Sequence, residues 1–278
     1  MKSFDVLLDL ALSEDLGGTG DVTSRAVFSD QKSSAVLISK DNGILAGVPY
    51  FKKVFSRIDP DVSVVFKKSD GDTLTEGDQV AFISGLTVSI LEAERTAINF
   101  ISFLSGIATM SSGYVKAASS GRAVILDTRK TLPGYRELSK YAVAAGGAQN
   151  HRMGLYDMVM IKDNHIDAAG SITSAVERVR EKWGSKYRIE VETRNTAEVQ
   201  EAVNAGADIV MLDNMSSKEC AEAVKMFAGK VLFEASGNMN LEKVREYSSV
   251  NVDFISVGAL THSVKAFDFS LRIVPDDR

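Results

Sequence analysis

Residues 188–213 have the sequence RIEVETRNTAEVQEAVNAGADIVMLD, in which two apolar segments flank a helical one. Arg188–Val191 and Ile209–Leu212 are the predicted strands, because each is a short apolar run next to polar residues. About one βα unit separates them, which is the length that returns a chain to a neighbouring parallel strand. Each strand is followed by a carboxylate, Glu192 or Asp213. The stretch predicts a parallel sheet that is covered by helices and carries acidic residues at one edge.

The pattern of strand, loop and helix repeats from residue 122 toward the C-terminus. Four further apolar strands are predicted, at Ala123–Leu126, Met158–Ile161, Val231–Phe233 and Phe254–Val257. The residues at the ends of all these strands are, in chain order, Asp127, Lys162, Glu192, Asp213, Glu234 and Gly258. Strand ends converge on one mouth in a β/α barrel, whereas an open doubly wound sheet places ligands only at its switch point. The consecutive charged ends therefore favour an α/β barrel.

The N-terminal part of the chain has a different character. Short extended runs alternate with turns there, and a helical patch lies at Pro49–Ile58, which predicts a small α+β sheet domain. A long helical segment, Thr87–Thr109, joins this domain to the barrel, and Gly106 weakens that helix near its end. The expected domains are residues 1–110 and 111–264, with residues 265–278 packing back on the first domain.

Composition limits the possible partners. The chain has 278 residues, a net charge of −5 and 45% hydrophobic residues, as expected for a globular protein with a sizeable core. It contains no block of basic residues, so nucleic acid is not an expected partner. No apolar run approaches the ~18 residues of a membrane helix. A single cysteine, Cys220, fits a reducing compartment, so we expect a cytoplasmic protein without a membrane partner.

Cationic residues gather after the first two barrel strands. Arg129 and Lys130 directly follow the first strand, His151 and Arg152 come before the second, and Lys162 ends it. Taken alone, an Arg-Lys pair is more often a solvated loop, and a single histidine is as often structural. Because all three groups are expected at one mouth, we favour a binding site for a small polyanion. Arginine supplies a planar fork for carboxylate or phosphate, and lysine supplies a mobile point charge.

Glu192 and Asp213 form the acidic half of the predicted site. Hard oxygen ligands one strand apart suit Mg²⁺, which keeps water and substrate phosphate in its shell. The alternative is a salt bridge between these carboxylates and Lys162. Both interpretations hold in turn if the bridge forms in the empty site and the metal binds in the filled one.

Small residues after the last two strands suggest a seat for phosphate. Ser236, Gly237 and Asn238 follow one strand and Gly258 follows the other, at the place where barrel enzymes bind phosphate through backbone amides. Arg95 lies elsewhere, on the joining helix beside Glu94. From the residues alone, an intrahelical surface pair is the better interpretation of that arginine.

Several segments together resemble the quinolinate phosphoribosyltransferase family, over residues 14 to about 270. The segments that carry the resemblance are Glu14-Asp15, Gly20–Ser24, Glu94–Ala97, Leu104–Thr109, Asp127–Thr131, Asn150–Tyr156, Ile161–Ile166, Ala205–Met215 and Ser256–Ser263. Their combination is highly specific, although each segment is short.

The resemblance implies a fold and a reaction. It implies an incomplete β/α barrel with an N-terminal α+β open-faced sandwich domain, assembled as a homodimer. The implied reaction converts quinolinate and phosphoribosyl pyrophosphate into nicotinate mononucleotide, pyrophosphate and carbon dioxide, with Mg²⁺, in de novo NAD biosynthesis.

The resemblance also implies roles for single residues. A basic pocket for quinolinate is implied at Arg129, His151, Arg152 and Lys162. The partner subunit is implied to supply Arg95 to the same site, which replaces the interpretation of that residue as a surface pair.

The remaining implied roles concern the phosphorylated sugar and the catalytic groups. Lys130 would contact the pyrophosphate-bearing substrate, and Glu192 and Asp213 would bind its Mg²⁺ or its ribose hydroxyls. The catalytic residues implied are Lys130, Lys162, Glu192 and Asp213. Ser236, Gly237 and Gly258 would lie against phosphate. The family has a second glycine where this chain has Asn238, so we expect an altered phosphate seat that keeps its backbone amide.

Other functions remain open at this stage. A relative with the same fold and another acceptor is the nearest, either the molybdenum-transport-associated homologue or an enzyme that uses nicotinate. A Schiff-base aldolase barrel that uses Lys162 is a second class. A carrier domain is a third, because Gly71–Gly85 has the turn-rich pattern of a lipoyl-like sandwich, although it lacks a lysine at the hairpin tip.

Overall fold

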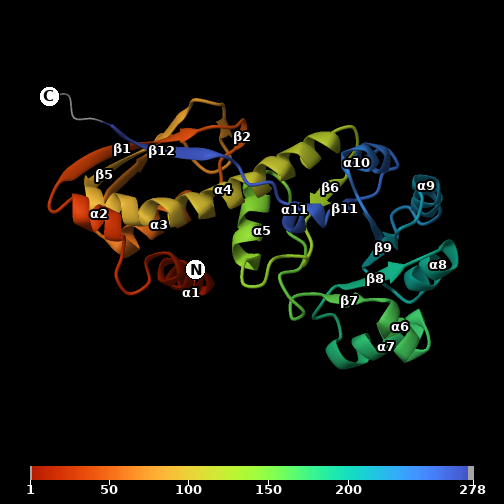
Figure 1. Ribbon diagram of the computed structural model, residues 1–278. Helices are drawn as coiled ribbons and strands as arrows, with labels where there is room; N and C mark the ends of the chain where they lie inside the picture. Colours follow the sequence, from red (N-terminus) through yellow and green to blue (C-terminus); the bar gives the residue numbers. More distant parts are fainter. Residues whose placement is uncertain (1, 275–278) are drawn as a thin grey trace. The chain divides into compact units, whose positions relative to one another are not determined.

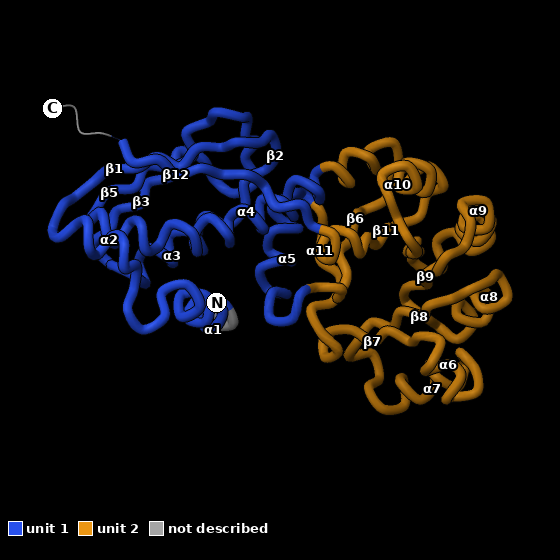
Figure 2. Tube along the Cα trace, in the orientation of Figure 1, with its two compact units in different colours: residues 1–112, 132–147, 264–278 blue, residues 113–131, 148–263 orange. Residues whose placement is uncertain are grey.

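The computed structural model describes residues 2–274, and side chains from Phe4 onward (Figure 1). The chain forms two compact units, each built from separate stretches of sequence (Figure 2). Unit 1 comprises residues 1–112, 132–147 and 264–278, and unit 2 comprises residues 113–131 and 148–263. This division differs from the expected one in one segment, because residues 132–147 belong to unit 1 and not to the barrel.

Unit 1 is built on an antiparallel sheet with the strand order β12-β1-β5-β3. The strands are β1 (Lys32–Ser39), β3 (Ser63–Phe66), β5 (Gln79–Leu86) and β12 (Phe269–Val274). Val65 and Phe82 are register partners on one face of the sheet and are 58% and 40% exposed. The sheet therefore has one open face, as in an open-faced sandwich. A short two-stranded sheet, β2 (Gly43–Ile44) with β4 (Thr73–Leu74), completes the strands of this unit.

Helix α3 (Val48–Ile58) agrees with the predicted helical patch. Phe51 of this helix packs edge-on against Phe66 of β3, and Phe51 and Phe55 are fully buried. The C-terminal segment returns to the same unit, because β12 pairs with β1 along its whole length. Residues 275–278 of the expected C-terminal segment lie outside the described residues.

Two helices before the sheet were missed by the sequence analysis, which interpreted this region as extended runs and turns. They are α1 (Lys2–Leu16) and α2 (Val22–Val27). Phe4, Leu8 and Leu12 recur at helical spacing on α1 and are buried, so the periodic signal was present. Helix α2 begins at Asp21, whose carboxylate accepts hydrogen bonds from the backbone N–H groups of Thr23 and Ser24.

The joining helix α4 (Thr87–Ala117) is longer than predicted and does not end near Gly106. The glycine is needed there because another part of unit 1 crosses the helix. A Cβ atom added at Gly106 would lie 2.2 Å from the backbone carbonyl oxygen of Lys265. The glycine therefore permits a close contact between α4 and the returning C-terminal segment.

Unit 2 contains a six-stranded parallel sheet with the order β6-β11-β10-β9-β8-β7. The strands are β6 (Val124–Leu126), β7 (Val159–Ile161), β8 (Ile189–Thr193), β9 (Ile209–Asp213), β10 (Leu232–Ser236) and β11 (Phe254–Ser256). All six strands predicted for the barrel are present. The order places β6 and β7 at the two edges of the sheet, so the sheet does not close. This is an incomplete α/β barrel.

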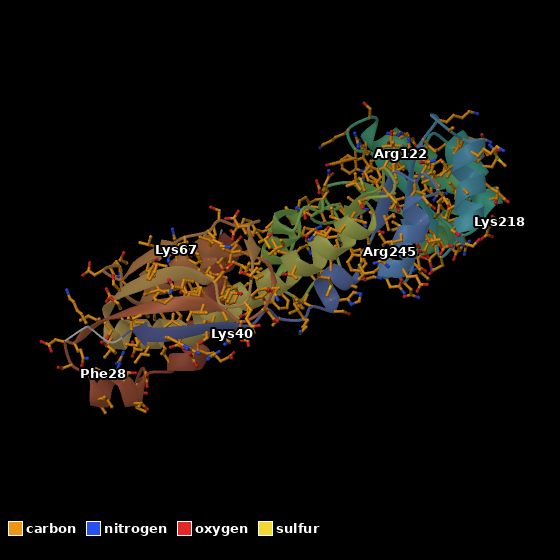
Figure 3. The ribbon with its side chains drawn as sticks, turned by 90° about the horizontal axis from the view of Figure 1, so that it is seen from above. Phe28, Lys40, Lys67, Arg122, Lys218 and Arg245 are labelled. Atoms are coloured by element: carbon orange, nitrogen blue, oxygen red, sulfur yellow. The ribbon has the colours of Figure 1, made fainter. Side chains whose placement is uncertain are left out.

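Helices follow the strands of unit 2 and bury their apolar faces. They are α6 (Asp163–Ala169), α7 (Ile172–Trp183), α8 (Thr196–Asn204), α9 (Ser217–Met226), α10 (Leu241–Ser248) and α11 (Ala259–His262). Charged side chains such as Lys218 on α9 and Arg245 on α10 are exposed (Figure 3). Helix α5 (Arg136–Ala145) follows β6 in sequence but belongs to unit 1.

Three predicted strand ends need correction. Strand β8 continues past Glu192 to Thr193, β10 continues past Glu234 to Ser236, and β11 ends before Gly258, at Ser256. The shift matters most for Glu234, because it places this carboxylate inside the barrel, where it is 1% exposed. Among the described residues, no helix is long and apolar enough to cross a membrane.

Gly106→Ala should destabilise the protein by about 1–3 kcal/mol, because the new methyl group must displace the backbone at Lys265. Gly113→Ala on the same helix is the matched control, since no atom lies within 4 Å of its added Cβ. Removing a helical glycine there should stabilise the protein by about 1 kcal/mol. Urea unfolding measures both changes. Equal effects of the two substitutions would contradict the proposed contact.

Candidate active site

The ends of the barrel strands surround a cavity of about 760 Å³. Each of the six strands contributes to its lining through its own residues or the loop that follows it. The polar lining residues are Thr128, Arg129, Lys130, His151, Arg152, Lys162, Glu192, Asp213, Asn214, Glu234, Ser236, Asn238, Ser256 and His262, together with Gly237 and Gly258. Residues that follow both edge strands, β6 and β7, line the same cavity. The sheet therefore curls far enough to bring its two edges to one barrel mouth.

All the predicted site residues except Arg95 line this cavity. Arg95 lies on α4 in unit 1, where it is exposed. Four polar lining residues were not predicted as site residues by the sequence analysis: Thr128, Asn214, Ser256 and His262. A fifth, Glu234, was recognised only as a strand end, and Glu190, directly behind the lining, was not recognised at all.

Arg129 and Arg152 lie close enough for their two positive charges to repel each other. Arg152 is 8% exposed, and its Nη1 donates a hydrogen bond to the carbonyl oxygen of Met158 at 3.0 Å. Burial lowers the pKa of Arg152, and the nearby charge of Arg129 lowers it further. A bound anion would relieve both effects, so the arrangement favours a negatively charged ligand.

Lys130 is exposed at the cavity, on a loop that the protein fixes through its backbone. Its N–H donates to the hydroxyl of Thr128, and its carbonyl oxygen accepts a hydrogen bond from Thr261 Oγ1 at 2.8 Å. The backbone is thus anchored while the ammonium group remains mobile. This suits a point charge that follows a ligand.

Lys162 and Glu192 form an ion pair across the ends of β7 and β8. The side chains are 42% and 15% exposed, so the pair lies at the cavity wall and is not sealed in the core. The bridge that we weighed against a metal site is therefore present between these two residues. Asp213 lies at the end of the neighbouring strand β9, two residues beyond Met211, the register partner of Glu192, and accepts a hydrogen bond from Asn214 Nδ2 at 2.8 Å.

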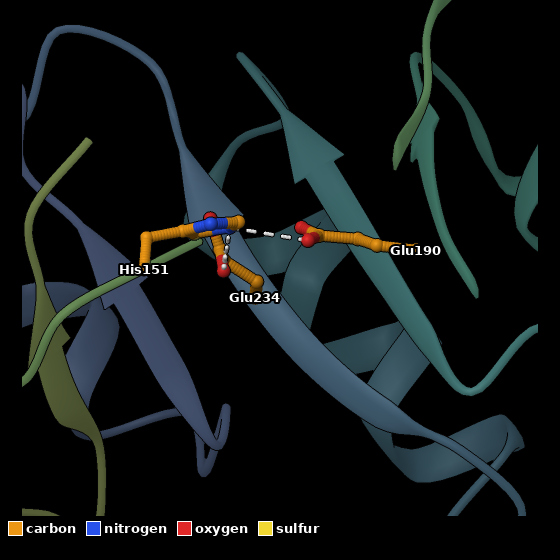
Figure 4. A group of neighbouring side chains, drawn as sticks. All are labelled: His151, Glu190 and Glu234. Atoms are coloured by element: carbon orange, nitrogen blue, oxygen red, sulfur yellow. Dashed lines mark ion pairs between the residues drawn. The ribbon is translucent and has the colours of Figure 1, made fainter. Parts of the chain in front are cut away.

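His151, from the loop before β7, meets Glu190 of β8 and Glu234 of β10 in a buried cluster (Figure 4). His151 Nε2 is 3.1 Å from Glu190 Oε2 and 3.4 Å from Glu234 Oε2. Burial lowers the pKa of His151, but the two neighbouring glutamates outweigh it and raise the pKa of the ring. Burial and the charge of Glu234 raise the pKa of Glu190 to about 7. The three groups are coupled and together hold one additional proton at neutral pH, and because His151 Nδ1 accepts the N–H of Arg152, that proton lies between Nε2 and the carboxylates.

A sequence signal for Glu190 existed in the alternation of β8. Glu190 and Glu192 are two residues apart, so they point to the same side of the strand. That side faces the barrel interior, where Glu192 reaches the cavity and Glu190 lies one layer deeper, with no exposed surface. The acidic residue in the middle of an apolar run was therefore a marker of the barrel interior.

The loop after β10 makes a tight turn with left-handed backbone at two successive residues. Gly237 has φ +114°, and a Cβ added there would lie 2.3 Å from Asn214 Oδ1. Asn238 has φ +44°, a left-handed conformation that Asn adopts more readily than most residues. Helix α10 starts two residues later, at Asn240. The departure from glycine at Asn238 thus leaves the left-handed turn in place.

An incomplete parallel barrel with a cationic cavity and a glycine turn defines an α/β-barrel enzyme for small, multiply charged anions. Comparison with known proteins narrows this class. Residues 107–272 match the C-terminal domain of quinolinate phosphoribosyl transferase, and residues 21–105 match its N-terminal domain. The chain belongs to the quinolinate phosphoribosyl transferase family.

Individual relatives agree over nearly the whole chain. A probable nicotinate-nucleotide pyrophosphorylase (carboxylating) of Bacillus subtilis is 43% identical, over 96% of this chain and 92% of the relative. NadC from Streptococcus pyogenes has a TM-score of 0.94 at 40% identity, covering 99% of this chain and 98% of that one. The nicotinate-nucleotide pyrophosphorylase from Francisella tularensis has a TM-score of 0.95 at 39% identity, covering 98% and 96%. The match over residues 21–105 also replaces the lipoyl-like interpretation of Gly71–Gly85.

Lys130→Met should weaken the binding of inorganic pyrophosphate by about 10- to 100-fold, because one charge-assisted contact contributes about 1.5–3 kcal/mol. Lys218→Met on α9 is the control, since this lysine is exposed and is not a lining residue of the cavity. Isothermal titration calorimetry of both variants measures the change. Equal binding by the two variants would remove Lys130 from the anion site.

Proposed function

We propose that this protein transfers the phosphoribosyl group of phosphoribosyl pyrophosphate to quinolinate and removes one carboxyl group as CO₂. The products are nicotinate mononucleotide, pyrophosphate and CO₂, and the reaction belongs to de novo NAD biosynthesis. The observation that carries the proposal is the cavity itself. It combines cations for a dicarboxylate with a glycine turn for phosphate, in a chain of the quinolinate phosphoribosyl transferase family.

Quinolinate is assigned to the part of the cavity near Arg129, Arg152 and Lys162. Two adjacent carboxylates on a pyridine ring need several cations, because burying them unpaired would be prohibitive. The repulsion between the like charges of Arg129 and Arg152 supports this assignment, since a dianion would stabilise both guanidinium groups. Lys162 would exchange its contact with Glu192 for one with substrate.

Phosphoribosyl pyrophosphate is assigned to the opposite side, from Lys130 to the turn after β10. Ser236, Gly237 and Asn238 offer a hydroxyl and backbone N–H groups, and Gly258 precedes the short helix α11. The mobile ammonium of Lys130 suits the pyrophosphate, whose negative charge grows as it departs.

The chemistry requires positioning and charge stabilisation, and no covalent nucleophile. The cationic residues hold the ring nitrogen of quinolinate toward the ribose carbon that carries pyrophosphate. The nitrogen attacks this carbon, and the bond to pyrophosphate breaks with its electron pair. The ring nitrogen is then cationic, so the adjacent carbon accepts the electrons of the breaking carboxyl bond before it takes up a proton.

Mg²⁺ fits the acidic edge of the cavity. Glu192 and Asp213 present hard carboxylate oxygens from neighbouring strands, next to the expected pyrophosphate, which is the donor set that Mg²⁺ prefers. These two residues would hold the ion through oxygen or through water. When bound, the ion neutralises negative charge on the leaving pyrophosphate. Lys162 neutralises Glu192 until then.

Incubation of the protein with quinolinate labelled at the carboxyl carbon next to the ring nitrogen, phosphoribosyl pyrophosphate and Mg²⁺ should release labelled CO₂ and form nicotinate mononucleotide. Lys162→Ala should abolish turnover and keep the fold, since this lysine is 42% exposed. Lys218→Ala is the control. Absence of both products would assign the chain to a relative with another acceptor. Formation of nicotinate mononucleotide from nicotinate, without CO₂ release, would do the same. Near-normal turnover by Lys162→Ala would remove Lys162 from the site.

We further propose that the protein is a cytoplasmic homodimer in which each active site is completed by the partner. The support for a shared site is Arg95, an exposed arginine on α4 of unit 1 that does not line the cavity in unit 2 of the same chain. The family resemblance assigns an arginine at this position to the neighbouring subunit. The support for a reducing compartment is Cys220, the single cysteine, which is a buried free thiol.

Mixing Arg95→Ala protein with Lys162→Ala protein should restore activity if subunits exchange. Hybrid dimers then contain one site with both substitutions and one site with neither. Up to about one quarter of wild-type activity per site is expected at random mixing of equal amounts. Each variant alone should remain inactive at all concentrations. Differently tagged chains verify that subunits have exchanged. If activity does not recover after verified exchange, a shared site is refuted.

A further inference from the structure

The cavity wall contains a buried cluster that substrate binding as proposed leaves without a role. Glu190 and Glu234 are 0% and 1% exposed, and the side chain of His151, which lines the cavity together with Glu234, is 6% exposed. Among residues 2–274, these three are a group of possible metal ligands whose atoms lie within 4.8 Å of one another. The geometry of the histidine ring decides what the cluster does.

The second ring nitrogen of His151 argues against a metal ion. The backbone N–H of Arg152 donates a hydrogen bond to His151 Nδ1 at 2.7 Å. Nδ1 must therefore keep its lone pair, which places the hydrogen of the ring on Nε2. A nitrogen that carries hydrogen has no lone pair for a metal. The Nε2–H group instead faces the two carboxylates at 3.1 and 3.4 Å.

The cluster is connected to the dicarboxylate site through the backbone of Arg152. Residues 150–152 belong to no helix or strand, so their position depends on hydrogen bonds from the surrounding barrel. The N–H of His151 donates to Asp127 Oδ1 at 2.8 Å, and the next N–H, that of Arg152, donates to the imidazole. Two successive backbone groups are therefore fixed by buried side chains.

We propose that Glu190 and Glu234 are positioning residues for the dicarboxylate site. They hold the His151 ring through Nε2, the ring holds the backbone of Arg152 through Nδ1, and the guanidinium of Arg152 is thereby aimed into the cavity. In this arrangement His151 lines the cavity and also holds the backbone of Arg152. The inference rests on the proposed function for its kinetic readout.

The charge of the cluster supports the same assignment. Glu190 lies close enough to Arg152 for its negative charge to stabilise the guanidinium. This effect counteracts burial and the repulsion from the positive charge of Arg129, which both destabilise it. No described residue forms a well-aligned hydrogen bond with either oxygen of Glu190, so the imidazole N–H is its available partner. A buried carboxylate with one such partner is costly to keep unless it serves a purpose.

Glu234→Leu removes the acceptor, and Glu234→Gln keeps an oxygen of the same size and reach. The Michaelis constant for quinolinate should rise at least about 10-fold in Glu234→Leu, whereas that for phosphoribosyl pyrophosphate changes less than about 3-fold. Glu234→Gln should restore both constants to within about 3-fold of the wild type. A change in quinolinate binding of this size corresponds to ~1.4 kcal/mol or more.

Asp253→Leu is the control for a carboxylate acceptor lost away from the cavity; the side chain of Asp253 is 18% exposed and also pairs with Arg122. Asp253 accepts a hydrogen bond from the N–H of Phe233 at 2.9 Å, at the opposite ends of β10 and β11. This variant should lose stability and leave the ratio of the two Michaelis constants unchanged. Equal changes of both constants in Glu234→Leu, or no rescue by Glu234→Gln, would overturn the positioning role.

Nitrogen-15 spectra of the imidazoles test the hydrogen bonding of the His151 ring without any activity measurement. The chain has three histidines, so His165→Asn and His262→Asn assign the signals. His151 should show a protonated Nε2 and an unprotonated Nδ1 in the wild type and in Glu234→Gln. A protonated Nδ1 would refute the proposal, as would stoichiometric metal in the purified protein that is lost in Glu234→Gln. If quinolinate is not the substrate, the kinetic prediction fails but the spectral one still stands.

Discussion

Repulsion between like charges in one half-enclosed cavity is the constraint on which this structure depends. Arg129, Lys130, Arg152 and Lys162 all converge on the barrel mouth, and burial makes their repulsion stronger than it would be in water. The protein meets the constraint by placing carboxylates on three neighbouring strands and cations at the two edges of the sheet. Carboxylates on β8, β9 and β10 face cations from β6 and β7, and the curl of the sheet brings the two groups together.

The carboxylates act at two depths. Glu192 is partly exposed and pairs with a mobile lysine, so the contact is free to exchange for substrate. Glu190 lies two residues earlier on the same strand, has no exposed surface, and faces a histidine whose ring is held on its other side by a backbone N–H. One strand thus supplies both an adjustable counter-charge and a fixed one. The cavity is rigid where it must present a guanidinium and adjustable where ligands enter.

Much of this arrangement was predictable from the sequence. Each barrel strand was an apolar run, and most cavity residues stand directly after such a run, so the strand ends predicted the mouth. The buried cluster was predictable only in part: the spacing of Glu190 and Glu192 places both on one side of β8, but the sequence does not indicate that His151 and Glu234 meet Glu190 there. The positions of His151 and Arg152 depend on hydrogen bonds in an irregular loop. For Arg95, the residues alone favoured a surface pair, and only the family resemblance assigned it to an active site. Residues 132–147 were assigned to the barrel domain because chain order does not reveal that an intervening segment returns to the other unit.

The path of the chain has a consequence for the protein as a whole. It passes between the units at residues 112/113, 131/132, 147/148 and 263/264, so neither unit is one continuous stretch. Arg129 and Lys130 stand just before one passage, and His151 and Arg152 follow soon after the next. Truncation before β12 would also leave β1 with an unpaired edge. No single cleavage or gene fusion point can therefore separate the sandwich from the barrel.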